Sequence, residues 1–302
     1  MKLVQPPFLK KGDKVAIVSP ARSITFEEVH PSIRLFQEWG FEVVLGIYVF
    51  SRHHQFAGKD DQRLNDLQQV LDDNSIRAIF CARGGYGTVR ILDRLDFTKF
   101  RNNPKWITGY SDITILHTHV QKHLGIQTLH STMLFNIKED DFESDTIISL
   151  KNALFGEQLF YKKRITFRDR TGLSTGIVTG GNISILYSLM GTPTEFETNG
   201  KILFLEDVDE YLYHLDRMMM NLKRAGKFKN LKGLIVGSLK DMKDNPIPFG
   251  QSAEDIIADA VKEYQFPVCF DFPAGHDSIN LALYLGRMAT FKVDEEVSLV
   301  YG

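Results

Sequence analysis

The sequence has few cysteines, no long apolar run and no excess of charge of one sign. Its 302 residues include two cysteines, Cys81 and Cys269, and both lie inside apolar runs. Two such thiols do not make a disulfide framework, and they suit a reducing compartment. Lys and Arg total 36 against 38 Asp and Glu, which gives a net charge of −2. This balance argues against a nucleic-acid-binding protein, which needs excess positive charge to hold a phosphate backbone.

No apolar run comes close to the roughly 18 residues that cross a bilayer, so the sequence predicts no membrane-spanning helix. The segment Met1–Phe8 contains one lysine and two prolines but lacks an apolar core. We therefore predict no signal peptide, and we expect a cytoplasmic protein.

What the chain does have is the composition of an ordinary globular protein, with 43% hydrophobic and 25% charged residues. At about 150 residues per domain, its length favours two domains. A chain of this size buries enough apolar surface to fold without a disulfide or a structural metal.

The first half of the chain alternates strand and helix patterns. Repeated βα units predict a parallel sheet with helices on both faces. The expected strands are Lys14–Ser19, Phe41–Leu45, Ala78–Cys81 and Trp106–Thr108, and the expected helices are Phe26–Trp39, Lys59–Leu71 and two that begin near Thr88 and Ile113.

The segment 155–171 interrupts this pattern, because it is polar, basic and aromatic and has no helical period. We predict an N-terminal α/β domain over residues 1–155, a linker over 156–171 and a C-terminal domain over 172–302. The second half mixes strand and helix patterns around a core of its own. Its last strands, within Leu283–Val300, have the pattern of a hairpin.

Gly109-Tyr110-Ser111-Asp112 lies between a predicted strand and a predicted helix. A serine on such a sharp turn exposes its hydroxyl at the carboxyl end of the sheet. The backbone N–H of the next residue, Asp112, can donate to an oxyanion. The motif matches the nucleophile elbow Gly-x-Ser-x-Gly only in part, because Ile113 replaces the second glycine. The alternative is that Ser111 or Asp112 simply caps the helix.

The run Ala82–Gly87 is rich in glycine and also follows a strand. Glycines let a backbone approach a ligand closely and point its N–H groups at it. The spacing matches neither a dinucleotide-binding motif nor a Walker A motif. A second oxyanion donor, a phosphate site and a plain tight turn all remain open here.

Four carboxylates, within Glu206–Glu210, follow an apolar strand. They could stabilise the first turn of a helix, bind a hard metal ion or orient a histidine. Glu206 is nearest to the strand end, where a side chain points into a crevice. The acidic run alone does not decide between these uses.

His276 is the histidine best placed for chemistry, because it follows Gly275 in a loop after the apolar strand Val268–Phe270. His53 and His54 lie in a polar loop. The spacing of His119 and His123 resembles that of metal ligands, but their segment lacks the Glu of His-Glu-x-x-His, so we interpret them as a solvated helix face. Ser111, Glu206 and His276 follow one another in an order that serine triads are known to use.

Five motifs together resemble the LD-carboxypeptidase family, which includes muramoyltetrapeptide carboxypeptidases and the microcin C self-immunity proteins. The resemblance extends from Gly12-Asp13 to Gly286, nearly the whole chain, with no departure at a triad position. The motifs are Ala82–Gly87, Gly109-Tyr110-Ser111-Asp112, Gly180-Gly181-Asn182, Leu205-Glu206-Asp207 and Pro273-Ala274-Gly275-His276.

The resemblance implies a flavodoxin-like N-terminal domain, a C-terminal mixed α/β domain and a Ser-Glu-His triad between them. It also implies a cytoplasmic, commonly dimeric enzyme without cofactor or metal. The family reaction removes a terminal D-amino acid from an L,D peptide bond of a murein tetrapeptide, a step of cell-wall recycling.

Carried over to this chain, the family pattern makes Ser111 the nucleophile, His276 the base and Glu206 its orienting acid. The N–H groups of Gly85 and Asp112 would receive the oxyanion. Asp207 would support Glu206. Two weaker candidates for holding the substrate are Arg83 and Asn182.

Two other functions stay open. The first is a hydrolase for microcin-like aminoacyl nucleotides, which would need an aromatic platform for the base. Trp39 and Trp106 fall in a predicted helix and strand, which leaves Tyr211 or Tyr213 for that role. The second is a non-catalytic module that binds an anion or a peptide with Ser111 and the glycine N–H groups.

Overall fold

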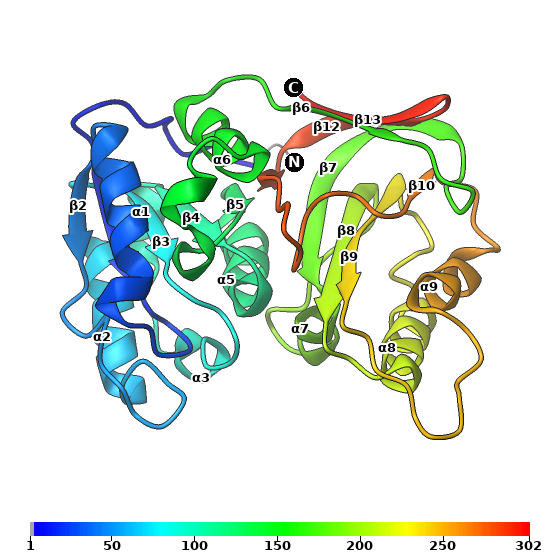
Figure 1. Ribbon diagram of the computed structural model, residues 1–302, viewed down its shortest axis with the longest axis horizontal. Helices are drawn as coiled ribbons and strands as arrows, with labels where there is room; N and C mark the ends of the chain where they lie inside the picture. The colour runs from blue at the N-terminus through cyan, green and yellow to red at the C-terminus, as the bar shows by residue number, and fades with distance from the viewer. Residues whose placement is uncertain (1–2) are drawn as a thin grey trace. The chain divides into compact units, whose positions relative to one another are not determined.

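The computed structural model describes residues 3–302 and divides the chain into two compact units. The first unit comprises the described residues up to Glu157 together with Leu281–Tyr284, and the second comprises Gln158–Asn280 and Leu285–Gly302. Each unit contains one β-sheet, as Figure 1 shows. The first two residues of the segment predicted to lack a signal peptide lie outside the described residues.

The sheet of the first unit has the strand order β11-β5-β4-β3-β1-β2. Its pairs β1/β2, β1/β3, β3/β4 and β4/β5 are parallel. The order 2-1-3-4-5 is that of flavodoxin-like folds, so the predicted fold class is confirmed for this half. The strands are β1 (Lys14–Val18), β2 (Glu42–Leu45), β3 (Ile76–Cys81), β4 (Trp106–Gly109), β5 (Thr128–His130) and β11 (Leu283–Leu285).

Consecutive residues of β1, β3 and β4 are buried, so both faces of these central strands are covered. Helix α1 begins with a capping box in which Thr25 and Glu28 bond each other's backbone N–H groups. Figure 1 shows α1 and α6 in front of this sheet. The helices of the first unit are α1 (Phe26–Glu38), α2 (Asp60–Asp72), α3 (Val89–Leu92), α4 (Thr98–Asn102), α5 (Thr114–His119) and α6 (Asp145–Phe155).

The sheet of the second unit has the order β10-β9-β8-β7-β12-β13-β6. It is parallel from β10 to β7 and antiparallel from β7 to β6, which confirms the predicted mixed sheet. The predicted hairpin is also present, as β12 pairs with β13. The strands are β6 (Phe160–Arg164), β7 (Gly172–Asn182), β8 (Lys201–Val208), β9 (Gly233–Lys240), β10 (Val268–Cys269), β12 (Met288–Val293) and β13 (Glu296–Tyr301).

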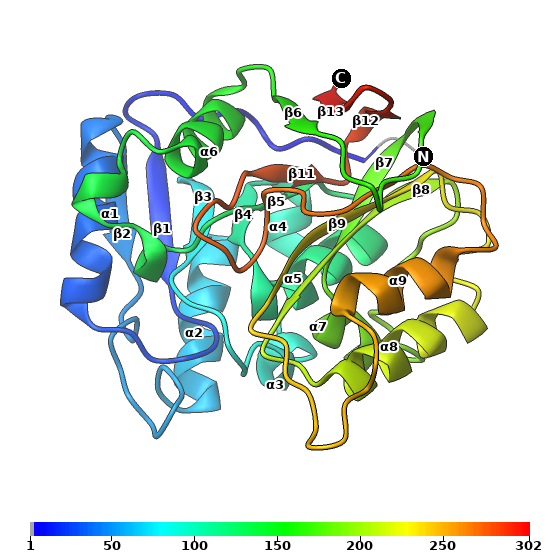
Figure 2. The same ribbon diagram turned by 45° about the vertical axis from the view of Figure 1, so that its right-hand side comes forward.

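Three helices cover the parallel part of the second sheet. They are α7 (Ile183–Ser188), α8 (Leu212–Arg224) and α9 (Ala253–Val261). Figures 1 and 2 show α8 and α9 side by side. Leu215, Met219 and Leu222 of α8 are buried and pack into one apolar cluster with β8 and β9. This packing fixes the carboxyl end of β8, where the acidic run begins.

The structure differs from the predicted domain boundaries in two places. The segment 156–171 is not a free linker, since β6 pairs with β13 at the edge of the second sheet. Its exposed lysine and arginine side chains suit an edge strand and obscured the strand pattern. In addition, β11 comes from the C-terminal part of the chain but joins the first sheet. Over residues 3–302, none of the helices combines the length and apolar character needed to span a bilayer.

Candidate active site

Ser111 stands on a strained turn at the carboxyl end of β4. Its φ is +59°, in the left-handed region that residues other than glycine seldom adopt. A 3-10 turn, Ser111–Ile113, and then α5 follow at once. The strand, sharp turn and helix are the local structure of a nucleophile elbow. They place the serine at the end of the sheet where the carboxyl ends of the parallel strands lie. The N-cap positions of the 3-10 turn and of α5 are occupied by Tyr110 and Ile113, so neither Ser111 nor Asp112 stands at a cap position.

The carbonyl oxygen of Gly109, two residues before Ser111, is held from two sides. It accepts hydrogen bonds from Ser131 N at 3.2 Å and from His117 Nε2 at 2.9 Å. Burial lowers the pKa of His117 to about 3, a shift that the bond to Gly109 opposes. The imidazole is therefore neutral and carries its proton on Nε2, which fixes the start of the serine turn.

The glycine-rich loop passes directly beside Ser111. A Cβ added at Gly84 would lie 3.1 Å from Ser111 Cβ and 3.3 Å from its Oγ. Gly85, the next residue, has a φ of +100°, which favours glycine. The predicted close approach of this backbone to the serine is therefore present within the first unit.

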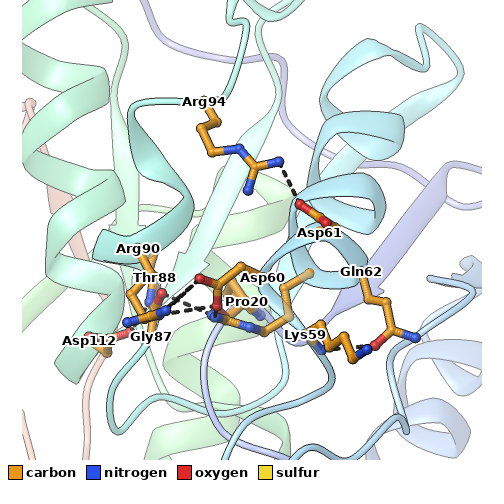
Figure 3. Close-up of polar contacts among 11 residues, drawn as sticks. Pro20, Lys59, Asp60, Asp61, Gln62, Gly87, Thr88, Arg90, Arg94 and Asp112 are labelled. Atoms are coloured by element: carbon orange, nitrogen blue, oxygen red, sulfur yellow. Dashed lines mark hydrogen bonds and ion pairs between the residues drawn. The ribbon is translucent and has the colours of Figure 1, made fainter.

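The Asp112 side chain ties the serine turn to the end of the glycine loop. Its Oδ2 accepts a hydrogen bond from Thr88 N at 2.9 Å, and the residue is fully buried. Burial raises the pKa of Asp112, against the bond from Thr88 and the charge of Arg63. Figure 3 shows Thr88 and Asp112 meeting at this point.

A buried arginine that the sequence analysis did not single out holds the other side of the loop. Arg63 of α2 donates to Pro20 O at 2.5 Å and to Gly87 O at 2.9 Å, and it pairs with Asp60. Figure 3 shows these three partners, Pro20, Gly87 and Asp60, lying close together. Arg63 thus joins the segments that follow β1 and β3. Its helical position among polar residues gave no signal of this use.

In the second unit, Glu206 and His276 form a hydrogen-bonded pair. Oε2 of Glu206 lies 2.5 Å from Nδ1 of His276. Glu206 is fully buried at the end of β8, whereas the His276 side chain is 16% exposed. Since a carboxylate only accepts, Nδ1 carries the proton, and Nε2 is the basic nitrogen of the neutral imidazole.

The environment of His276 favours its protonated form. Burial is the largest single influence and acts to lower the pKa. The charge and hydrogen bond of Glu206, with the charge of Asp207, outweigh it, so the pKa of His276 is raised above its usual 6.5. A carboxylate that stabilises the imidazolium in this way is what a general base needs during proton transfer.

Two hydrogen bonds from backbone N–H groups hold the loop that carries His276. Gly275 N donates to Asn280 Oδ1 at 2.8 Å, and Ser238 N donates to Ala274 O at 3.0 Å. A Cβ at Gly275 would lie 2.9 Å from both Cβ and Oε2 of Glu206. Only glycine therefore lets this loop lie against the buried carboxylate.

The acidic run Glu206–Glu210 divides among different partners. Asp207 accepts from Asn182 Nδ2 and from Ser184 N, both at 2.9 Å, on the side of β8 away from Glu206. Burial and the neighbouring charge of Glu206 raise the pKa of Asp207 to about 7. Asp209 pairs with Lys243, and Glu210 with His214. Among residues 3–302, no three His, Cys, Asp or Glu side chains are grouped as metal ligands.

The two weaker substrate-binding candidates have partners within their own units. Asn182 caps α7 by accepting from Ile185 N at 3.1 Å, besides its bond to Asp207. The Arg83 guanidinium lies 3.4 Å from Glu28 and stacks over the Phe135 ring. The Asn182 contacts hold the β7–α7 turn.

The interpretation of His119 and His123 as a solvated helix face was wrong for His119. Its ring lies half-buried against Phe97, and burial lowers its pKa to about 4. His123 is exposed as expected. The nearby aromatic ring of Phe97 lies too far along the sequence to have revealed this packing.

Comparison with known proteins identifies the family of this chain. Residues 15–131 match the family described as the LD-carboxypeptidase N-terminal domain, and residues 175–291 match its C-terminal domain. The chain is 34% identical to a probable murein peptide carboxypeptidase of Bacillus subtilis, over 98% of this chain and 94% of the relative.

Solved structures show the same fold over the whole chain. A muramoyltetrapeptide carboxypeptidase from Oxalobacter formigenes has a TM-score of 0.86 at 26% identity, over 96% of this chain and 98% of that one. The microcin C7 self immunity protein MccF has a TM-score of 0.87 at 22% identity, over 100% and 99%. The second likeness concerns the fold alone.

The raised pKa of His276 predicts the pH dependence of activity. The base must be neutral, so kcat/KM should rise with pH through a midpoint above 6.5. In Glu206→Gln the carboxylate is gone and burial dominates, so the midpoint should fall while the rate drops. Glu210→Gln, which removes the other carboxylate paired with a histidine, should leave the midpoint in place. An unchanged midpoint in Glu206→Gln would contradict the pairing.

Gly85→Ala should impair the loop beside Ser111. The new Cβ would lie 2.3 Å from Arg22 Cδ at a φ of +100°. Backbone strain of this kind costs about 1–3 kcal/mol of conformational free energy. We expect kcat to fall because the strained loop would shift away from Ser111. Gly12→Ala is the control, since its φ is +88° and its Cβ would have nothing within 4 Å. Both variants should be compared by kcat and by thermal unfolding. We expect kcat to fall in Gly85→Ala and to stay at the wild-type value in Gly12→Ala.

Proposed function

Since the chain belongs to the LD-carboxypeptidase family, we propose that it is a serine carboxypeptidase that releases terminal D-alanine from murein tetrapeptides. The observation that carries the proposal is the hydrogen bond between Glu206, near the end of β8, and His276, in the loop after β10. The elbow conformation of Ser111 supports its role as nucleophile. The name of the Bacillus subtilis relative supports a murein peptide as substrate.

In the proposed reaction, Oγ of Ser111 attacks the carbonyl carbon of the L,D peptide bond. His276 Nε2 takes the hydroxyl proton and passes it to the nitrogen of the leaving D-alanine. A water molecule, which gives a proton to the same imidazole, then attacks the ester carbonyl. The bond from the carbonyl carbon to Oγ breaks, the imidazolium returns the proton to Ser111, and the tripeptide leaves. Glu206 holds the imidazole in the required tautomer and stabilises its positive charge throughout.

The N–H groups of Gly85 and Asp112 are the proposed donors to the oxyanion. Asp112 directly follows Ser111, and the neighbour of Gly85 in the loop lies against the Ser111 side chain. Loss of one such donor typically costs about 3 kcal/mol of transition-state stabilisation. Arg63 and the Asp112 carboxylate hold the two donor segments, so they act by positioning and not by contact with substrate.

We further propose a cytoplasmic homodimer that binds no nucleic acid and no membrane and needs neither metal nor cofactor. The net charge of −2 argues against nucleic-acid binding, and the two cysteines within apolar runs suit a reducing compartment such as the cytoplasm. Each part of the proposed reaction is assigned to a side chain or a backbone N–H group.

One observation favours a second candidate substrate, an aminoacyl nucleotide. Tyr211 and Tyr213 are each 41% exposed and their ring centroids lie 5.7 Å apart. Lys243 and Arg217 lie over these rings. Such a cationic aromatic surface, shortly after Glu206 in the chain, could stack a base. Activity on an aminoacyl-adenylate analogue without activity on murein peptides would favour this candidate.

Ser111→Ala should abolish turnover of a murein tetrapeptide. Loss of a triad member typically lowers kcat by a factor on the order of 10⁴ to 10⁶. The variant should keep its fold, because only a half-buried hydroxyl is removed. Mass detection of the tripeptide product measures the loss. Combining Ser111→Ala with His276→Ala should add little, and residual activity above about a tenth would exclude Ser111 as nucleophile.

The stereochemistry of the leaving residue distinguishes this proposal from a general peptidase. The side chains of D- and L-alanine point in opposite directions from the backbone, and a misplacement of about 1 Å can cost on the order of 10²-fold in rate. We therefore expect the L-alanine epimer to be cleaved at least ~10²-fold more slowly than the D-alanine peptide. Equal rates on the two epimers, compared by product mass, would reject the LD-carboxypeptidase assignment.

A further inference from the structure

Three loops of the first unit begin at the carboxyl ends of the neighbouring strands β1, β3 and β4. The strand order reverses between β1 and β3, and ligands of open α/β sheets bind outside the strand ends at such a switch point. Arg22 follows β1, Gly84 and Gly85 follow β3, and Ser111 follows β4. Arg22 is thus a cation at the place where the topology predicts a ligand.

The Arg22 side chain lies directly on the glycine loop. Its backbone N donates to Gly84 O at 3.3 Å. A Cβ at Gly85 would lie 2.3 Å from Arg22 Cδ and 3.2 Å from its Nε, whereas one at Gly84 would lie 3.3 Å from Ser111 Oγ. Consecutive Cα atoms are about 3.8 Å apart, so Arg22 and Ser111 contact adjacent residues of one loop.

The buried guanidinium of Arg63 fixes the backbone that carries Arg22. Arg63 Nη1 bonds both Pro20 O, two residues before Arg22, and Gly87 O, two residues after Gly85. The same buried guanidinium therefore holds the two loops in register. A binding group on a backbone held in this way loses less freedom when it takes up a ligand.

The other arginines around the loop already have partners. Arg63 is fully buried with Asp60, and Arg90 donates three hydrogen bonds to the same carboxylate. Arg83 pairs with Glu28. Arg22 is exposed, and within residues 3–302 its guanidinium has neither an ion pair nor a side-chain hydrogen bond. Its charge remains available for a ligand.

We propose that Arg22 binds the terminal carboxylate of the substrate. The inference rests on the proposed carboxypeptidase function and adds a specificity-determining residue to it. In a peptide with a free C-terminus, the carboxylate is separated from the scissile nitrogen by a single Cα. A group that binds it must therefore lie close to the nucleophile and the oxyanion donors, as Arg22 does. A guanidinium can bind both carboxylate oxygens, which aligns the leaving residue as well as attracting it.

The test compares two substrates on each variant, a tetrapeptide ending in free D-alanine and the same peptide as its C-terminal amide. The wild type should prefer the free acid. Arg22→Gln should lower kcat/KM for the acid about 10- to 100-fold and leave kcat/KM for the amide unchanged. Arg22→Lys should give an intermediate preference, because it keeps the charge but not the paired donors.

Arg52→Gln is the matched control, since Arg52 is also an exposed arginine of the first unit and contacts His54 instead of the glycine loop. It should keep the wild-type preference. A wild-type preference in Arg22→Gln, or its loss in Arg83→Gln instead, would overturn the assignment of Arg22 alone. A wild type that cleaves neither peptide would overturn the proposed function, and the role of Arg22 with it.

Discussion

The burial of the Glu206 carboxylate is the constraint on which the second unit's part of the site depends. A buried charge is costly unless a partner meets it, and His276 is that partner at 2.5 Å. The surrounding fold has to hold Glu206 and His276 at this distance. The apolar cluster under α8 and α9 sets the end of β8, and Gly275 leaves room for the loop to lie against Glu206. The same contact raises the pKa of the imidazole and selects the nitrogen that would act as base in the proposed reaction.

In the first unit, the fold brings backbone N–H groups close to the side chain of a serine. Gly84 and Gly85 allow the approach, and the left-handed φ of Ser111 presents the hydroxyl. Polar side chains beneath the surface then hold the segments. Arg63 joins the loops after β1 and β3, and Asp112 joins the serine turn to Thr88. The proposed catalytic geometry of this unit is therefore held by buried groups, to which the proposed reaction assigns no contact with substrate.

Much of this arrangement could be predicted from the sequence, because the apolar runs and glycine motifs are local signals. They predicted the parallel strands of the first sheet, the helix α1 and the hairpin of β12 and β13. The mixed α/β character of the C-terminal domain was implied by the family resemblance. The pairing of Glu206 with His276 was predicted from their positions after strands and from the family resemblance. In the structure these two side chains do meet.

The features that sequence reasoning missed depend on contacts between distant segments. β6 is a polar edge strand, and β11 joins the first sheet although it lies near the end of the chain. Arg63 and Arg22 contact the glycine loop over separations that no local pattern records. His117 looks like any helical histidine until its bond to Gly109 is seen.

In the proposed reaction, His276 activates Ser111 as the nucleophile. Labelling with a serine-reactive fluorophosphonate, followed by peptide mass mapping, is the decisive experiment. We expect one label per chain, on Ser111, with loss of activity in proportion. Labelling should be abolished in His276→Ala, a variant whose fold is checked by circular dichroism. Full activity after Ser111 is labelled, or equally fast labelling in His276→Ala, would exclude this pair of roles.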